Sequence, residues 1–111
     1  MFHSDSPTET RAFLRDVLRM RSCDVGEGWL IFEAPPADIG VHPPSTHGPV
    51  GTHVISFSCD SIEATVAELS GRGVVFTREI RDDGYGLTTE FEAPGGVRCE
   101  LYQPRYALTF E

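Results

Sequence analysis

The sequence contains no lysine, and its nine basic residues are all arginines. Covalent chemistry that needs a lysine, such as Schiff-base formation, is therefore excluded. No apolar run approaches the roughly 20 residues that cross a bilayer, and the N-terminus lacks the basic-then-apolar layout of a secretory signal. We therefore expect a cytoplasmic protein with no membrane partner.

The sequence also lacks the cysteine and serine motifs that are typical of metal-binding, disulfide-linked or serine-nucleophile proteins. The three cysteines, Cys23, Cys59 and Cys99, show no Cys-x-x-Cys spacing, so neither a disulfide framework nor a zinc knuckle is predicted. We expect Cys59 and Cys99 to act as small buried hydrophobes. A Gly-x-Ser-x-Gly nucleophile elbow is absent. The net charge is −8 with scattered arginines, which argues against nucleic acid as a partner and leaves a cationic ligand open.

The chain carries an internal duplication. Residues 5–14 (DSPTETRAFL) align with residues 60–69 (DSIEATVAEL) at an offset of 55 (60 − 5), and both copies are expected to open a helix. Ser6 with Glu9 predicts a capping box on the first helix, and Asp60 with Glu63 predicts the same on the second. A second echo, Phe-Glu-Ala-Pro, begins at residues 32 and 91, an offset of 59 (91 − 32).

The length of 111 residues suits one domain rather than two. We expect residues 1–111 to form a single domain, divided into module 1 (1–43), a linker (44–51), module 2 (52–104) and a C-terminal tail (105–111). Each module is predicted to read strand, helix, strand, strand, strand. The expected strands are 52–59, 74–80, 86–92 and 98–103 in module 2, and 23–25, 29–33 and 37–42 in module 1. Only residues 1–4 remain for the opening strand of module 1.

Three segments in this order resemble the vicinal-oxygen-chelate superfamily, which includes glyoxalases, bleomycin resistance proteins and extradiol dioxygenases. They are the helix Arg-Ala-Phe-Leu-Arg-Asp-Val-Leu, the helix Asp-Ser-Ile-Glu-Ala-Thr-Val-Ala-Glu-Leu and the closing Ala-Pro-Gly-Gly-Val-Arg-Cys-Glu-Leu-Tyr. The resemblance covers almost the whole chain. It implies an α+β fold in which two βαβββ modules form open, curved, mixed sheets around a cleft, here with the first strand shortened.

The resemblance also implies a divalent metal site, with ligands from the first and last strand of each module and the metal acting as a Lewis acid. Glu100 falls on the ligand glutamate of the second module. Gly40 stands at the equivalent position of the first module and offers no ligand. Val54 stands where a histidine is expected, and His53, one residue earlier, faces the other side of the strand. The remaining histidine position would precede Met1. We therefore expect no complete metal site and no cofactor, although a divalent metal stays possible.

Other polar and aromatic side chains are expected in the cleft. The candidate ligand-binding residues are His3, His42, Ser56, Arg98, Glu100, Tyr102 and Trp29. Glu100 and His42 are also the candidate ligands of a rewired metal site. A cluster of His3, His42 and Glu100 could be such a site, a general acid/base pair or a hydrogen-bonding set, or it could line a groove without chemistry. Tyr85 and Phe91 are read either as apolar walls for a ligand or as core. No catalytic residue is assigned.

Three readings of the function follow. The first is a protein that binds a small organic molecule in its cleft without the usual complete metal site, as the bleomycin-resistance branch binds cationic antibiotics. The second is a metal-dependent lyase, isomerase or dioxygenase with an altered ligand set around Glu100. The third is a structural or regulatory module without a ligand. Whether the chain is an enzyme stays open. A homodimer is expected from the resemblance, because open sheets leave apolar faces and edges for a second chain.

Overall fold

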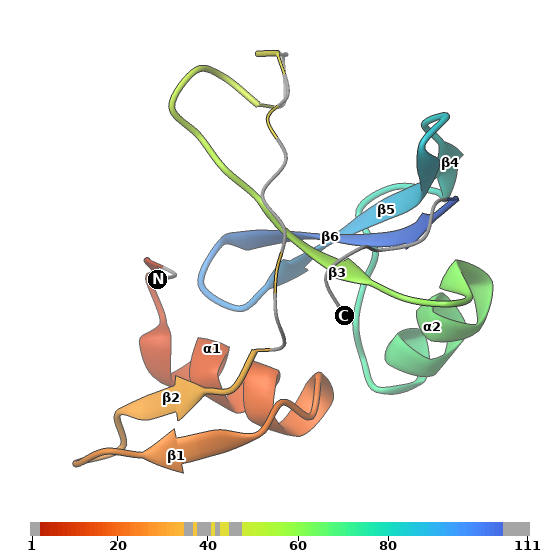
Figure 1. Ribbon diagram of the computed structural model, residues 1–111. Helices are drawn as coiled ribbons and strands as arrows, with labels where there is room; N and C mark the ends of the chain where they lie inside the picture. Colours follow the sequence, from red (N-terminus) through yellow and green to blue (C-terminus); the bar gives the residue numbers. More distant parts are fainter. Residues whose placement is uncertain (1–2, 35–36, 38–40, 42, 45–47, 106–111) are drawn as a thin grey trace.

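The computed structural model describes residues 3–34, 37, 41, 43–44 and 48–105. Its second module has the predicted order of strand, helix and three strands. The elements are β3 (Ile55–Ser58), α2 (Ile62–Gly71), β4 (Arg81–Asp82), β5 (Gly86–Ala93) and β6 (Val97–Pro104). The four strands form one open mixed sheet in the order β3-β6-β5-β4, and α2 packs along one side of it (Figure 1).

Strand pairing gives this sheet two chemically different faces. β3 runs parallel to β6, whereas β5 is antiparallel to both β6 and β4. Because side chains alternate across a strand, Ser56, Glu90 and Glu100 share one side, which we call the polar face. Phe57 and Leu101, one residue along from Ser56 and Glu100, share the other side, which we call the helix face.

The core lies between the helix face and the two helical segments. Its buried members are Ile62, Leu69, Val74, Phe91, Ala93, Val97, Cys99 and Leu101. Phe91 is 1% exposed, and its ring centroid lies 6.2 Å from that of Phe13, 6.5 Å from Phe57 and 5.7 Å from Phe76. Aromatic pairs at such separations add to the hydrophobic stabilisation of a core. Phe91 is therefore a core residue and not a wall of the cleft.

The first module contains α1 (Pro7–Ala12), a π-helical turn η1 (Phe13–Val17), β1 (Ser22–Asp24) and β2 (Leu30–Phe32). β1 and β2 form an antiparallel pair, and Figure 1 places this pair beside α1. α1 begins 55 residues before α2 (62 − 7), and β1 begins 59 residues before β4 (81 − 22). These are the two offsets of the sequence repeat, so the predicted duplication is confirmed in the structure.

The start of the chain docks onto the turn between β5 and β6. The Asp5 N–H donates to the Gly95 carbonyl at 3.2 Å, and the hydroxyls of Ser4 and Thr10 are 2.6 Å apart. The Thr10 hydroxyl also donates to the Pro94 carbonyl. Thr10 is 4% exposed, so its hydroxyl needs these partners. The contacts tie the first helix to the second sheet.

The predicted helix caps are wrong in detail. Ser6 is the N-cap residue of α1 but makes no side-chain cap hydrogen bond. Its N–H, which would donate to Glu9 in a capping box, donates to Ser4 Oγ at 3.0 Å instead. On α2 the cap is Ser61, one residue after the predicted Asp60. The Ser61 hydroxyl accepts a hydrogen bond from Ala64 N–H, as an N-cap serine does.

The strand predicted at 74–80 is also wrong. This segment touches β5 only through the Phe76–Phe91 bridge and a hydrogen bond from Thr77 N–H to the Glu90 carbonyl, and regular pairing begins at β4. Val74 and Phe76 show the spacing of a strand because both side chains pack toward the core, although the segment is not part of the regularly paired sheet.

Two expectations concern the strands of the first module. Residues 3 and 4, the described part of its expected first strand, are not in a strand, and most of its expected strand at 37–42 falls outside the described residues. No helix in the described ranges is both long and apolar enough to cross a membrane.

Candidate functional site

The polar face is centred on Glu100 of β6. Ser56 lies directly opposite it on β3, and the Ser56 hydroxyl donates to Glu100 Oε1 at 2.8 Å. The structure therefore brings together two of the predicted site residues. Tyr102 and Arg98 lie two residues to either side of Glu100, so strand alternation places them on the same face, as predicted.

A second carboxylate lies beside Glu100. Glu90 of β5 is its direct partner across the antiparallel pair. The sequence held the signal for this neighbour, because the short turn at Pro94–Gly96 sets Ala93 opposite Val97, and counting back along both strands leads to Glu90 and Glu100. Two carboxylates side by side on one face repel each other and attract cations.

Glu90 is partly neutralised by a network that continues toward the sheet edge. Arg78 Nε is 4.0 Å from Glu90 Oε2, and the Arg78 guanidinium donates to the carbonyl and hydroxyl of Thr88, both at 2.9 Å. The fully buried Thr88 hydroxyl donates to Asp83 Oδ2 at 2.7 Å. Arg81 donates to the other oxygen of Asp83 at 2.6 Å and holds the pKa of that carboxyl below its usual value.

Glu100 differs from Glu90 in its lack of a neighbouring arginine partner among the described residues. Across the described ranges, Glu90 has an arginine within 4.0 Å, whereas Glu100 has no ion-pair partner. Tyr85, which is 46% exposed, lies close enough for the Glu100 carboxylate to affect its titration. Burial raises the pKa of the Tyr85 phenol, and the nearby Glu100 and Asp83 charges raise it further. A half-buried carboxylate next to an aromatic ring can bind an organic cation.

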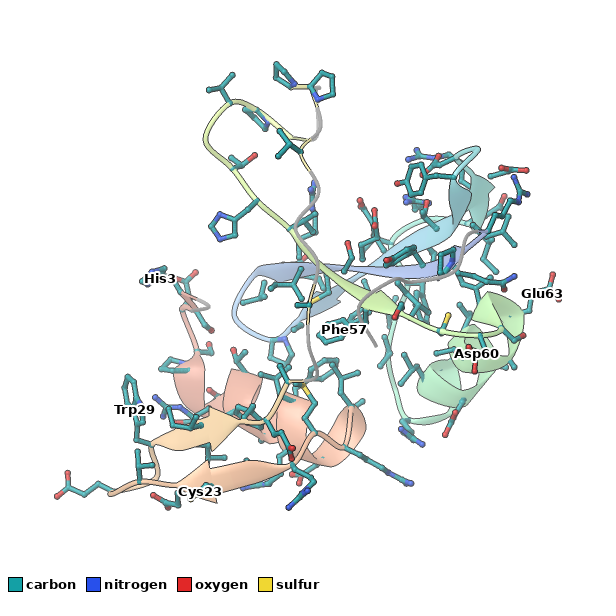
Figure 2. All side chains as sticks on the ribbon, viewed as in Figure 1. His3, Cys23, Trp29, Phe57, Asp60 and Glu63 are labelled. Atoms are coloured by element: carbon teal, nitrogen blue, oxygen red, sulfur yellow. The ribbon has the colours of Figure 1, made fainter. Side chains whose placement is uncertain are left out.

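The other predicted site residues lie elsewhere or outside the described part. Figure 2 shows His3 at the N-terminal end of α1 and Trp29 at the start of β2. His3 directly precedes Ser4 and Asp5, which dock at the β5–β6 turn. Glu100 lies about 10 Å further along β6 than the first residue of that strand. The Arg11 guanidinium lies over the Trp29 ring, with its Cζ atom 4.9 Å from the ring centroid of Trp29. His42 lies outside the described residues, so its predicted role stays a prediction.

The donor set around Glu100 does not fit the metal site that the fold implies. Glu100 is accompanied by a second carboxylate, a serine hydroxyl and a nearby arginine, and no imidazole lies among the described residues of this face. In the described part of the chain, no three side chains of His, Cys, Asp or Glu are grouped so that they could hold a metal ion. Arg78 at 4.0 Å from Glu90 would also oppose a divalent cation there.

A cavity of about 250 Å³ lies on the other side of the sheet. Its lining includes Phe57, Phe91 and Leu101 of the helix face, so it does not open onto Glu100. Figure 2 shows Phe57 on the side of β3 that faces the first helix. Sequence patterns do not predict this cavity, because helix-face positions of an amphipathic strand are expected to be filled by packing.

Comparisons with known proteins agree with the fold. The model of the Glyoxalase/Bleomycin resistance protein/Dioxygenase superfamily matches residues 5–101. A comparison with the curated proteins found no match. Similar solved structures include TnmS3, an antibiotic binding protein from Streptomyces sp. CB03234, at 23% identity over 91% of this chain and 88% of that one, with a TM-score of 0.63.

Two further solved structures show the same likeness. A lactoylglutathione lyase from Agrobacterium tumefaciens is 18% identical, with 92% of this chain and 88% of that chain covered and a TM-score of 0.66. A superfamily member from Sphaerobacter thermophilus DSM 20745 is 22% identical, with 93% and 91% covered and a TM-score of 0.61. At these identities the likeness concerns the fold, and its open sheets match the architecture described above.

Proposed function

Because this chain belongs to the Glyoxalase/Bleomycin resistance protein/Dioxygenase superfamily, we propose that it binds a small organic cation on the polar face, with Glu100 as the main contact. The observation that carries the proposal is the contrast between the two neighbouring carboxylates. Glu90 is compensated by Arg78, whereas in the described part of the chain Glu100 has the Ser56 hydroxyl and no ion-pair partner. The Glu100 charge is thus oriented and left for a ligand.

The local geometry supports an amine or amidine as the recognised group. Ser56 engages Glu100 Oε1 and holds the carboxylate in one orientation, which reduces the entropy lost on binding. A cation that donates to Oε2 gains a charge-assisted hydrogen bond. The exposed Tyr85 ring can cover an aromatic or apolar part of the same molecule.

Two wider observations favour this reading. The chain carries a net charge of −8, which raises the local concentration of cations around it. Among similar structures, TnmS3 is described as an antibiotic binding protein. Both are consistent with a binding protein for a small organic molecule in this superfamily.

The alternative function is a metal-dependent lyase, isomerase or dioxygenase with an altered ligand set. One observation favours it, since the strand register sets Glu90 beside Glu100, and carboxylate pairs are common ligands of hard divalent cations. This alternative requires a further ligand, for which His42 is the candidate.

Benzamidine, an aromatic amidinium, and its neutral isostere benzamide provide the test by isothermal titration calorimetry. We expect benzamidine to bind more tightly than benzamide, and Glu100→Gln to weaken benzamidine binding about tenfold, the equivalent of about 1.4 kcal/mol. Glu27→Gln, which removes one exposed charge at the β1–β2 turn, should leave binding unchanged and controls for net charge.

Elemental analysis of the untagged protein tests the alternative in the same preparation. About one metal per chain, lost in both Glu100→Ala and His42→Ala, would overturn the organic-cation proposal in favour of the metal-dependent one. Equal binding of benzamide and benzamidine, or equal binding by Glu100→Gln, would also contradict it.

The expected homodimer remains a proposal. β3 is an edge strand of the four-stranded sheet, and the β1–β2 pair exposes Val25, Trp29 and Ile31, each more than half accessible. Such edges and apolar side chains favour association with a second chain. Light scattering coupled to size exclusion should give twice the mass of one chain, and a monomer at micromolar concentration would contradict this expectation.

A further inference from the structure

The cavity on the helix face lies between α2 and the segment that follows η1. Phe57, Phe91 and Leu101 form its floor on the sheet, Leu69 of α2 forms one wall, and Leu18 with Met20 forms the opposite wall. Its volume is about 250 Å³. We propose that this cavity is a second binding site, which takes an uncharged molecule of about one aromatic ring with a short apolar chain.

The volume supports a ligand of this size. An enclosed cavity of about 150 Å³ lined by Leu, Ile and Phe holds a benzene molecule. The present cavity is larger and partly open, and it shares leucine and phenylalanine side chains with that lining. The additional space here allows a ring to carry a few more carbon atoms. The ring of Phe57 is stacked on that of the buried Phe91 at 21° and 6.5 Å, so Phe91 holds the Phe57 ring in place and a flat ligand would meet the Phe57 ring at the floor.

The polar groups of the lining argue for an uncharged ligand. Arg72 donates to the Val17 carbonyl at 2.9 Å and is paired with Glu68, so its charge is already compensated. The Cys59 thiol donates to the Tyr102 carbonyl at 3.5 Å, and burial raises its pKa. Arg72 and Glu68, the charged side chains that line the cavity, are thus paired with each other. An ion that enters the cavity would lose hydration without meeting an unpaired opposite charge.

The local backbone explains why the space is not filled by the chain itself. The first helix ends in the π-helical turn η1, and Arg19, with φ of 57°, turns the chain away after Leu18. The Met20 N–H then closes the turn on the Leu14 carbonyl at 3.0 Å. Met20 is one of the side chains that line the cavity, and its flexible thioether can adapt to an entering molecule.

This site is independent of the proposed function, because Phe57 and Leu101 point to the opposite side of the sheet from Ser56 and Glu100. The probes are 3-phenylpropanol and its charged counterpart 3-phenylpropanoate, titrated into ¹⁵N-labelled full-length protein at neutral pH. We expect the alcohol to shift the amide signals of Phe57, Leu69 and Leu101. The carboxylate should bind at least about tenfold more weakly, because its charge must be desolvated.

Filling the cavity should abolish binding. Met20→Trp and Thr65→Leu each add side-chain volume to the lining, so loss of at least about tenfold in affinity is expected for both. If one variant fails to fold, the other gives the same answer. Glu100→Gln should bind the alcohol as the unaltered protein does, which separates failure here from failure of the polar-face proposal. Equal binding by the folded filled variants, equal binding of the carboxylate, or shifts confined to the polar face would overturn the proposal.

Discussion

Gly95 offers a sharp test of how the two halves of the molecule are joined. Its φ is +92°, a backbone conformation that a residue with a Cβ adopts only with strain. A Cβ at this position would overlap Ser4 Oγ and lie 2.9 Å from Thr10 Oγ1. We therefore expect Gly95→Ala to strain the turn and, since Ser4 Cβ would also lie within 3.0 Å, to displace the N-terminal segment from the β5–β6 hairpin.

The expected cost is the sum of these two effects. The backbone strain contributes about 1 kcal/mol. Displacing the segment breaks the bonds from Asp5 to Gly95 and from Thr10 to Pro94, each with a net contribution of about 1 kcal/mol. We expect Gly95→Ala to lower the free energy of unfolding by roughly 3 kcal/mol and the melting temperature by roughly 10 °C, measured by urea and thermal denaturation followed by circular dichroism.

Gly73→Ala is the matched control. Gly73 has the same φ of +92°, but a Cβ there would meet nothing within 4 Å. It should cost only the backbone strain, about 1 kcal/mol. Ser4→Gly should relieve part of the overlap, so combining it with Gly95→Ala should be less damaging than the sum of the two changes. Equal costs for Gly95→Ala and Gly73→Ala would refute the docking argument.

Three further predictions concern stability. Arg19→Gly should raise the free energy of unfolding by about 1 kcal/mol, because Arg19 has a φ of 57° that glycine adopts without strain; a destabilised variant would contradict this. Ser61→Ala should cost about 1 kcal/mol by removing the α2 cap, whereas Ser6→Ala should cost clearly less, and equal costs would restore the predicted capping box. Arg81 lowers the pKa of Asp83, so this pair stabilises the folded state above about pH 4 and loses its effect as the pH falls further. In Asp83→Asn the free energy of unfolding should therefore fall less steeply below about pH 4 than in the unaltered protein. An unchanged pH dependence would contradict the assignment.

The structure also shows where sequence reasoning about the elements succeeded. Both helices that the repeat predicts are present, and each buries a leucine from it, Leu14 at 6% and Leu69 at 7% exposed, because helical spacing sets which side of a helix is apolar. The 59-residue offset of the second echo was not carried over to the preceding strand. Applied to the strand expected at 23–25, it gives residues 82–84, which overlap β4 (Arg81–Asp82) and not the strand expected at 74–80.

The candidate site was less predictable. Alternation along β6 was enough to group Arg98, Glu100 and Tyr102, because the two sides of a strand follow from residue parity alone. It did not reveal that Arg78 reaches Glu90 and Thr88, because the segment that carries Arg78 is irregular and has no period to extrapolate. That contact makes the difference between Glu90, which has an arginine partner, and Glu100, which has none among the described residues.

The sequence by itself thus determined the duplication, the α+β class and the sidedness of each regular element, since these depend on local spacing and on repeats that can be read directly. Only the tertiary structure decided that the N-terminal segment docks at Gly95, that Glu90 stands beside Glu100 with Arg78 in reach, and that a cavity remains under Met20. These features join residues far apart along the chain, and which of them meet depends on how all the elements pack together.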